Sequence, residues 1–197
     1  MYVIKGMKAL NAVRDDVLFT SDQLFYDEDI LYERQSWTVE QMNDYLIQKW
    51  NSVVKRNDIV FHLGNFSVGS IPLTKSVLQK LNGNINLIIG TSDTHDTILA
   101  CKDRLMSISY KLDIFINDIS ITLNHHPQLN WNRKNEGAWM LHGSTFHNQP
   151  LLINEKLLDV GVDGYDGEPI SFEQIYSIMD RKEKYIYNQQ KLTPKTL

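Results

Sequence analysis

Five times along this chain, a short apolar segment of the kind that forms a buried strand ends at a turn of polar residues. Polar turns at the ends of buried strands are where layered α/β proteins keep their functional side chains. The order of these turns constrains the fold more than any single motif does. They are Ser21-Asp22-Gln23-Leu24-Phe25, Gly64-Asn65-Phe66, Gly90-Thr91-Ser92-Asp93, and Asn124-His125-His126-Pro127 followed by Gly143-Ser144-Thr145-Phe146.

The composition is that of an ordinary globular protein, because 42% of the 197 residues are hydrophobic and 22% are charged. We therefore predict one domain over residues 1–197, with a polar extension over about 181–197. The net charge of -4 gives no overall attraction to nucleic acid. Cys101 is the single cysteine, and no apolar run approaches the ~20 residues of a membrane span. These features predict a cytoplasmic protein, and the abundance of Asn, Ile and Lys suggests a bacterial or phage source.

The first half of the chain reads as strand, helix, strand, helix, strand, which predicts crossover units and a layered α/β core. Apolar runs at 17–20, 58–63 and 85–89 are the strands, and 73–81 is the second helix. Thr38 opens the first helix, with Gln41 completing a capping box. The expected buried stripe of this helix is Met42, Tyr45, Leu46, Trp50, Val53 and Val54.

The second half is richer in strands. Segments 113–116 and 119–123 flank Asn117-Asp118, a pair that favours a tight hairpin turn. Further short strands are predicted at 139–142 and 151–153. Ser171 caps a closing helix with Gln174 at its capping-box position.

The ordered turns resemble those of the calcineurin-like metallophosphoesterase family, in its small prokaryotic and phage branch. The resemblance runs from about Val17 to about Ile175 and includes Asp58–Gly64, Leu81-Asn82-Gly83 and Asp159–Asp163. It implies a four-layered α/β/β/α sandwich with mixed sheets. It also implies a site for two divalent ions, commonly manganese, iron or zinc, which activate water and clamp phosphoryl oxygens.

The first two turns depart from the family's ligand pattern. Asp22 keeps the first aspartate, but Leu24 stands where the family has histidine, and Asn65 replaces the bridging aspartate. A neutral bridge leaves the repulsion between two dications poorly screened. Leu24 and Phe146 are expected to put apolar bulk where metal and water would lie.

The later turns depart as well. Thr91 and Ser92 replace an asparagine and a histidine, while Asp93 remains. Ser144 and Phe146 replace two histidines around Thr145. Of the family's seven ligands, the residue type survives only at Asp22 and His125.

These replacements predict no two-metal centre and no cofactor. The leading hypothesis is a pseudoenzyme that acts by binding a protein partner, as an inhibitor or adaptor. The first alternative is a divergent phosphoesterase with a rearranged or single-metal site, using manganese or another divalent ion. Its residues are Asp22, Asn65, Thr91, His125 and perhaps the shifted His95. The second alternative is a metal-free nucleotide or phosphate binder that uses the backbone N–H groups of Gly64, Gly90 and Gly143.

Several residues have a functional and a structural interpretation. His125 and His126 are expected on opposite faces of a strand, and so not to share an ion. His95, Asp96, His142 and His147 offer a shifted metal site, but we favour His62 and His142 as framework residues hydrogen-bonded behind the turns. Asp22 and Asp93 are expected to accept hydrogen bonds from nearby backbone N–H groups.

Two aromatic segments also have two interpretations. Trp131, with Trp139, Asn130, Asn132 and Arg133 near it, suits base stacking in nucleotide binding, although core packing is the commoner role of such residues. The segment 25–32, with Asp27, Glu28 and Asp29, is either a partner-binding surface or a solvated loop.

Overall fold

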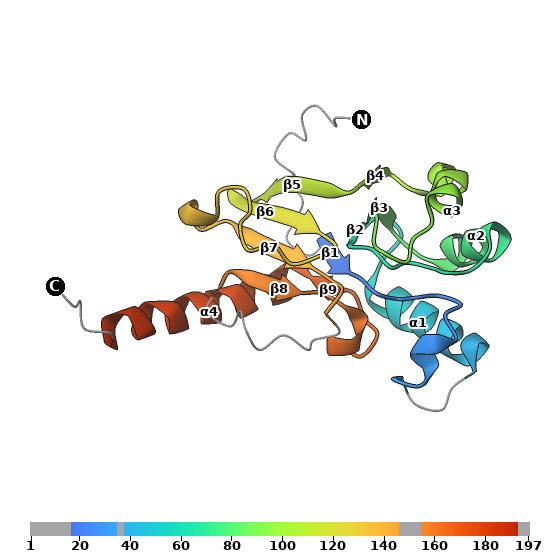
Figure 1. The fold of residues 1–197 in the computed structure, drawn as a ribbon, viewed down its shortest axis with the longest axis horizontal. Helices are drawn as coiled ribbons and strands as arrows, with labels where there is room; N and C mark the ends of the chain where they lie inside the picture. Colours follow the sequence, from blue (N-terminus) through green and yellow to red (C-terminus); the bar gives the residue numbers. More distant parts are fainter. Residues whose placement is uncertain (1–16, 35–37, 146–154, 193–197) are drawn as a thin grey trace.

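Two mixed β-sheets lie against each other and are flanked by helices in the computed structural model, which describes residues 17–34, 38–145 and 155–192 (Figure 1). The first sheet has the strand order β4-β3-β2-β1-β9 and the second β5-β6-β7-β8. The α/β sandwich with mixed sheets predicted from the turns is therefore confirmed. The first-sheet strands are β1 (Val17–Thr20), β2 (Ile59–His62), β3 (Asn84–Ile88), β4 (Ser107–Ser109) and β9 (Ile170–Ser171).

Strands β1 to β4 are mutually parallel, and β9 joins the edge at β1 in the antiparallel direction. The connections run through α1 (Val39–Val53), α2 (Ile71–Lys80) and α3 (His95–Ala100), which lie together beside this sheet (Figure 1). Buried Met42, Leu46 and Trp50 of α1 pack in one apolar cluster with Val60 and Ile85 of the sheet. The parallel order brings the ends of β1, β2 and β3, and hence three of the five turns, to one edge of the sheet.

A local capping box begins α1, and a hydrogen bond to a distant segment anchors its last turn. Thr38 Oγ1 accepts a hydrogen bond from the backbone N–H of Gln41, whose side chain accepts one from the Thr38 N–H, so the predicted capping box is confirmed. At the other end the indole N–H of Trp50 donates to the Asn82 carbonyl oxygen at 2.9 Å. Helix α2 begins at Ile71, two residues before the predicted start, because Pro72 is compatible with the first helical turn.

The second sheet consists of β5 (Lys111–Ile116), β6 (Ile119–Asn124), β7 (Trp139–His142) and β8 (Leu157–Asp159). Asn117 and Asp118 have φ of 49° and 66°, the left-handed conformation of a two-residue hairpin turn, so the predicted hairpin is confirmed. Strands β7 and β8 are parallel to β6. The predicted strand at 151–153 lies outside the described residues.

Helix α4 (Phe172–Leu192) follows β9 and extends past β8 (Figure 1). Its Phe172, Ile175 and Met179 join the apolar cluster between the sheets, which also contains Phe19 and Ile121. The capping box at its start is present, as predicted. The helix continues through most of the polar tail. No helix in the described part of the chain is both long enough and apolar enough to span a membrane.

Candidate functional site

The first two turns are joined through their backbones. The N–H of Asp22 donates to the Gly64 carbonyl oxygen, and that of Leu24 to the Asn65 carbonyl oxygen, each at 3.0 Å. Asp22, Leu24 and Asn65 all have positive φ, between 50° and 62°. Non-glycine residues seldom adopt this conformation, and it is concentrated at functional sites. Three residues in this uncommon conformation thus lie together where the first two turns meet.

Asp22 and Asn65 form a direct side-chain pair at the centre of this edge. The Asn65 Nδ2–H donates to Asp22 Oδ1 at 2.9 Å, and Asp22 Oδ2 accepts from the Ser21 hydroxyl at 2.6 Å and the Ser144 N–H at 2.9 Å. Asn65 Oδ1 accepts from the Ser92 N–H at 2.9 Å. Both side chains are buried. Each carboxylate and amide oxygen of the pair thus has a donor from within the protein.

Asp93 joins the second turn to the third. Its Oδ2 accepts from the N–H groups of Asn65 at 2.9 Å and Gly90 at 2.8 Å, and its Oδ1 accepts from the Phe66 N–H at 2.7 Å. The prediction that Asp22 and Asp93 accept hydrogen bonds from nearby backbone N–H groups is confirmed. Burial raises the pKa of both carboxyl groups, although these hydrogen bonds oppose the shift.

Gly64, Gly90 and Gly143, the glycines of the predicted phosphate-binding alternative, lie where neighbouring turns pack closely. A Cβ on Gly90 would lie 2.3 Å from the Asn65 nitrogen, and one on Gly143 would lie 2.2 Å from Ser21 Oγ. Their N–H groups donate to Asp93 and to the His125 carbonyl oxygen, and the Gly64 N–H donates to His62 Nδ1. The three N–H groups therefore have internal acceptors and are not directed at a ligand.

His125 and His126 follow the end of β6, and their rings contact each other edge to face, with centroids 4.6 Å apart. The expectation that they point to opposite faces is wrong, because both lie beyond the last strand residue. His125 is buried, and its Nδ1 lies 2.7 Å from the Leu63 carbonyl oxygen, which leaves Nε2 without a partner among the described residues. His126 is exposed, and its Nε2 is 3.0 Å from Thr91 Oγ1.

His62 and Gln23 form a buried polar pair behind the turns. His62 Nδ1 accepts from the Gly64 N–H, so its Nε2–H donates to Gln23 Oε1, and Gln23 Nε2 donates to Thr20 Oγ1. His142 Nδ1–H donates to the Gly143 carbonyl oxygen at 2.9 Å. Both histidines are framework residues, as predicted. Burial lowers the pKa of His62 to about 3.

His62 makes the fold sensitive to acid. Its folded pKa of about 3 lies below its ordinary value of 6.5, so the unfolded chain takes up a proton over this window and the folded chain does not. Stability is therefore lost as pH falls below 6.5, by about 2 kcal/mol between pH 7.5 and 5. Denaturant titrations should therefore show that the difference in unfolding free energy between wild type and His62→Gln decreases by about 2 kcal/mol from pH 7.5 to pH 5. A difference in unfolding free energy that stays constant with pH would contradict the lowered pKa of His62. The raised pKa values of Asp22 and Asp93 are present in both proteins, so their effects cancel in this comparison.

The last turn contacts the first. Ser144 has a φ of 67° and places its N–H on Asp22, while the Thr145 hydroxyl donates to Asp159 Oδ2. Leu24 belongs to the apolar cluster beneath α1, and its buried side chain takes part in the core. Phe146 and His147 lie outside the described residues.

Arg34 is a component of this site that the sequence analysis missed. Its guanidinium donates to the carbonyl oxygens of Asp22 at 2.6 Å and Gln23 at 2.8 Å, and it forms an ion pair with Asp163 at 2.8 Å. It therefore ties the 26–34 loop to the first turn and to the segment before β9. The sequence feature that could have identified Arg34 is its charge, since it is the only cation between Asp22 and Lys49 in an acidic stretch.

Other predicted site residues are placed elsewhere. His95 is exposed at the start of α3. Trp131 is buried, donates its indole N–H to the Ala138 carbonyl oxygen at 2.9 Å, and packs with Met140 and Leu157. Its role is therefore core packing, the structural alternative to base stacking. Within the described ranges, no group of three or more His, Cys, Asp or Glu side chains is arranged to hold a metal ion.

Sequence comparison finds proteins that are similar to this chain over somewhat less than three quarters of its length. No family model matches the chain. It is 29% identical over 150 residues to an uncharacterized protein of Methanocaldococcus jannaschii, covering 73% of this chain and 78% of that one. It is 23% identical over 176 residues to the gene 66 protein of Mycobacterium phage L5, covering 72% of this chain and 83% of that one.

Solved structures extend the comparison. A protein of unknown function from Aquifex aeolicus superposes with a TM-score of 0.68 at 20% identity, over 82% of this chain and 98% of that one. A novel archaeal phosphodiesterase superposes with a TM-score of 0.45 at 18% identity, over 74% and 81%. The two mixed sheets, their flanking helices and the ordered turns agree with the resemblance drawn from sequence. This chain therefore shares its two-sheet α/β fold with the protein from Aquifex aeolicus.

Proposed function

We propose that this protein is a metallophosphoesterase-like pseudoenzyme that has given up the two-metal centre and acts by binding a protein partner. The hydrogen bond from Asn65 Nδ2 to Asp22 Oδ1 carries the proposal. Two carboxylates at this distance would repel each other and need cations between them. An amide beside a carboxylate needs none, so the pair is satisfied without metal.

The remaining donors support the same conclusion. Asp22 accepts three hydrogen bonds from within the protein, and Asn65 Oδ1 accepts one from Ser92. A metal ion would have to displace these donors, and the amide nitrogen that faces Asp22 cannot act as a ligand. The residues present do not fit a two-metal centre of the family type. No catalytic step through a metal pair follows for this chain.

The partner-binding part of the proposal is supported by the 26–34 loop. Arg34 anchors this loop to the first turn and to Asp163, yet Tyr32 within it is 93% exposed. A tyrosine held on an anchored loop supplies contact area at low entropic cost and is typical of the residues that dominate protein interfaces. We therefore propose that the surface around Tyr32 contacts the partner.

Affinity capture from host lysate, with mass spectrometry and stoichiometry by densitometry, tests this proposal. We expect the wild-type protein to retain a stoichiometric partner and Tyr32→Ala to lose at least about tenfold of it, as for an interface hot spot. Tyr110→Ala is the matched control, since Tyr110 is 66% exposed between β4 and β5. Failure to capture any stoichiometric partner would argue against the proposal, as would equal capture by both variants.

A second candidate is a single-metal phosphoesterase, favoured by one observation. The buried His125 Nε2 has no partner among the described residues, and with Nδ1 bonded to the Leu63 carbonyl oxygen it carries a lone pair suited to a metal. Together with Asp22 and Asn65, it would be the ligand set. Manganese-dependent hydrolysis of a generic phosphodiester that disappears in His125→Ala supports this candidate. Activity that is unchanged in the variant comes from a contaminant.

A further inference from the structure

A hollow of about 350 Å³ opens between the 26–34 loop, α1 and the segment 162–167. Glu33 and Arg34 of its wall directly follow the exposed Tyr32 in the chain. Its volume is within the range of about 300–1,000 Å³ that is usual for ligand-binding pockets. The non-charged part of its wall consists of Met42, Tyr45 and Leu46 of α1 with Val162 and Gly167. The hollow therefore adjoins the surface that is proposed above to contact the partner.

Ion pairs and a hydrogen bond between the three segments hold the hollow in shape. Arg34 Nε lies 2.8 Å from Asp163 Oδ1, which joins the loop to the segment 162–167. Lys49 Nζ lies 2.6 Å from Asp166 Oδ2, and the Tyr45 hydroxyl donates to Asp166 Oδ1 at 2.8 Å, which joins α1 to the same segment. A hollow that is already formed costs a partner little ordering when it binds.

The charges around this hollow differ in depth, because the cations are shielded and the carboxylates face solvent. The Arg34 and Lys49 side chains are only 12% and 24% exposed, whereas the Asp166 side chain is 77% exposed. Four carboxylates lie at the hollow and its rim with two cations, an excess of two negative charges: Glu33, Asp163, Asp166 and Glu168 against Arg34 and Lys49. An approaching partner therefore meets a negatively charged rim, to which a positive group is complementary.

Asp166 stays ionised at neutral pH. The ammonium group of Lys49 and the Tyr45 hydroxyl both hydrogen-bond this carboxylate, and they hold its pKa below the ordinary value. Its φ of 52° directs the turn that carries it, and asparagine is the other residue type that tolerates this conformation well. The negative charge at the rim is therefore a fixed property of the fold near neutral pH.

The combination of an apolar wall and an anionic rim selects the kind of side chain that fits. A long cationic side chain buries its methylene stem along apolar surface and keeps its charged end at the rim. Arginine suits this site best, because its guanidinium bonds carboxylates in a fixed geometry and stacks on aromatic rings such as that of Tyr45. Arginine is also enriched among the residues that dominate protein interfaces.

We propose that this hollow receives an arginine side chain of the protein partner. The stem of the arginine lies against the apolar wall, and its guanidinium reaches the carboxylates of the rim. The inference rests on the proposed partner-binding role and gives the chemistry of the segment that docks beside Tyr32.

Fluorescence anisotropy with the labelled peptide Gly-Arg-Gly-Arg-Gly and the full chain tests the proposal, in about 0.15 M salt to screen non-specific attraction. We expect one saturable site and no saturable binding of the peptide Gly-Glu-Gly-Glu-Gly. Asp166→Asn removes one rim charge, keeps the left-handed turn, and should weaken binding of the arginine peptide about threefold. Glu33→Gln, at an exposed position of the loop, should weaken it by a similar factor.

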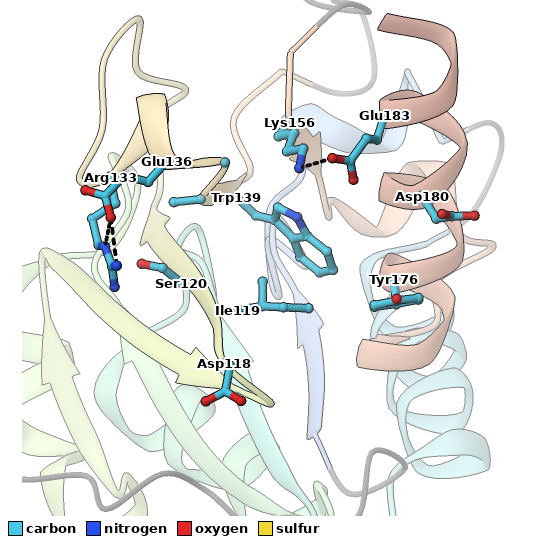
Figure 2. Close-up of a pocket in the computed structure, with 12 residues that line it drawn as sticks. Asp118, Ile119, Ser120, Arg133, Glu136, Trp139, Lys156, Tyr176, Asp180 and Glu183 are labelled. Carbon is cyan, nitrogen blue, oxygen red and sulfur yellow. Dashed lines mark hydrogen bonds and ion pairs between the residues drawn. The ribbon is translucent and has the colours of Figure 1, made fainter. Parts of the chain in front are cut away.

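The matched control is Asp118→Asn. It makes the same substitution at another left-handed position, with φ of 66°, and changes the net charge of the protein equally. Asp118 is at the β5–β6 hairpin turn, where it lines a separate cavity of about 360 Å³ beside α4 (Figure 2). This variant should bind the arginine peptide like the wild type. Thermal unfolding of each variant verifies that it is folded.

Three results overturn the inference: no saturable binding of the arginine peptide, equal weakening in Asp166→Asn and Asp118→Asn, or equally tight binding of the glutamate peptide. Failure of this inference is distinguishable from failure of the partner-binding role. If affinity capture loses the partner in Tyr32→Ala but retains it fully in Asp166→Asn and Glu33→Gln, the partner-binding role stands and the arginine site is overturned.

Discussion

Replacing Asp93 by alanine is expected to lower the free energy of unfolding by about 4 kcal/mol, because three buried backbone N–H groups lose their acceptor at once. These groups belong to Asn65, Phe66 and Gly90, and Asp93 itself is 7% exposed. The second and third turns then lose the carboxylate that joins them. Thermal unfolding followed by circular dichroism should show Tm lower by about 10 °C in a chain of this size.

Two comparisons make this result specific. Asp44→Ala on the exposed side of α1 changes only a solvated carboxylate and should stay within about 0.5 kcal/mol of wild type. Asp93→Asn keeps one acceptor oxygen and should fall between wild type and Asp93→Ala. A loss below about 1 kcal/mol in Asp93→Ala would show that water replaces the carboxylate and that Asp93 does not hold the turns together.

Asn65→Asp, which introduces the bridging aspartate that the resemblance implies at this position, is expected to destabilise the metal-free protein by about 3 kcal/mol at neutral pH. The amide that now donates to Asp22 Oδ1 at 2.9 Å becomes a second carboxylate at a buried position. The repulsion raises the pKa of the carboxyl pair, so the folded variant takes up a proton more readily than the unfolded chain. Its deficit relative to wild type should therefore shrink as pH falls toward 5.

Adding manganese distinguishes carboxylate repulsion in Asn65→Asp from a simple loss of packing. A dication between the two carboxylates relieves their repulsion, so Mn²⁺ should recover much of the Tm lost in Asn65→Asp while leaving wild type unchanged. Asn65→Ala is the control, since it loses the hydrogen bond without adding a charge and should show no response. Calorimetry on metal-stripped wild type gives the decisive result: two sites near micromolar affinity would overturn the metal-free proposal.

Residues close together in the chain account for the elements that were predicted well. The capping box of Thr38 and Gln41, the hairpin turn at Asn117-Asp118, and the cap at Ser171 each depend on contacts within three residues. Their conformations follow from side-chain hydrogen bonds and allowed φ values that depend only on neighbouring residues. A short window of the sequence is therefore enough to predict them. The core strands were predicted for a similar reason, because apolar runs between turn residues are local patterns.

Elements with weak local patterns were missed. β4 and β9 are only three and two residues long, and β9 pairs antiparallel with β1, far away in the sequence. α3 has six residues and carries exposed polar side chains, so no apolar stripe marks it. Arg34 was missed because its partners Asp22, Gln23 and Asp163 are on two different segments, and Asp163 is 129 positions away.

Local patterns in the sequence predict the succession of strands and polar turns, and the family resemblance implies the two-sheet α/β sandwich that the structure has. The resemblance also implies which ligand positions carry other residues, because the residue at each position is a property of the chain alone. Only the tertiary structure decided what those residues do. Asn65 donates to Asp22 across 43 positions, Asp93 accepts from a turn 27 positions away, and Leu24 enters the core instead of the site. Hydrogen bonds and packing between segments depend on distances that appear only once the chain has folded.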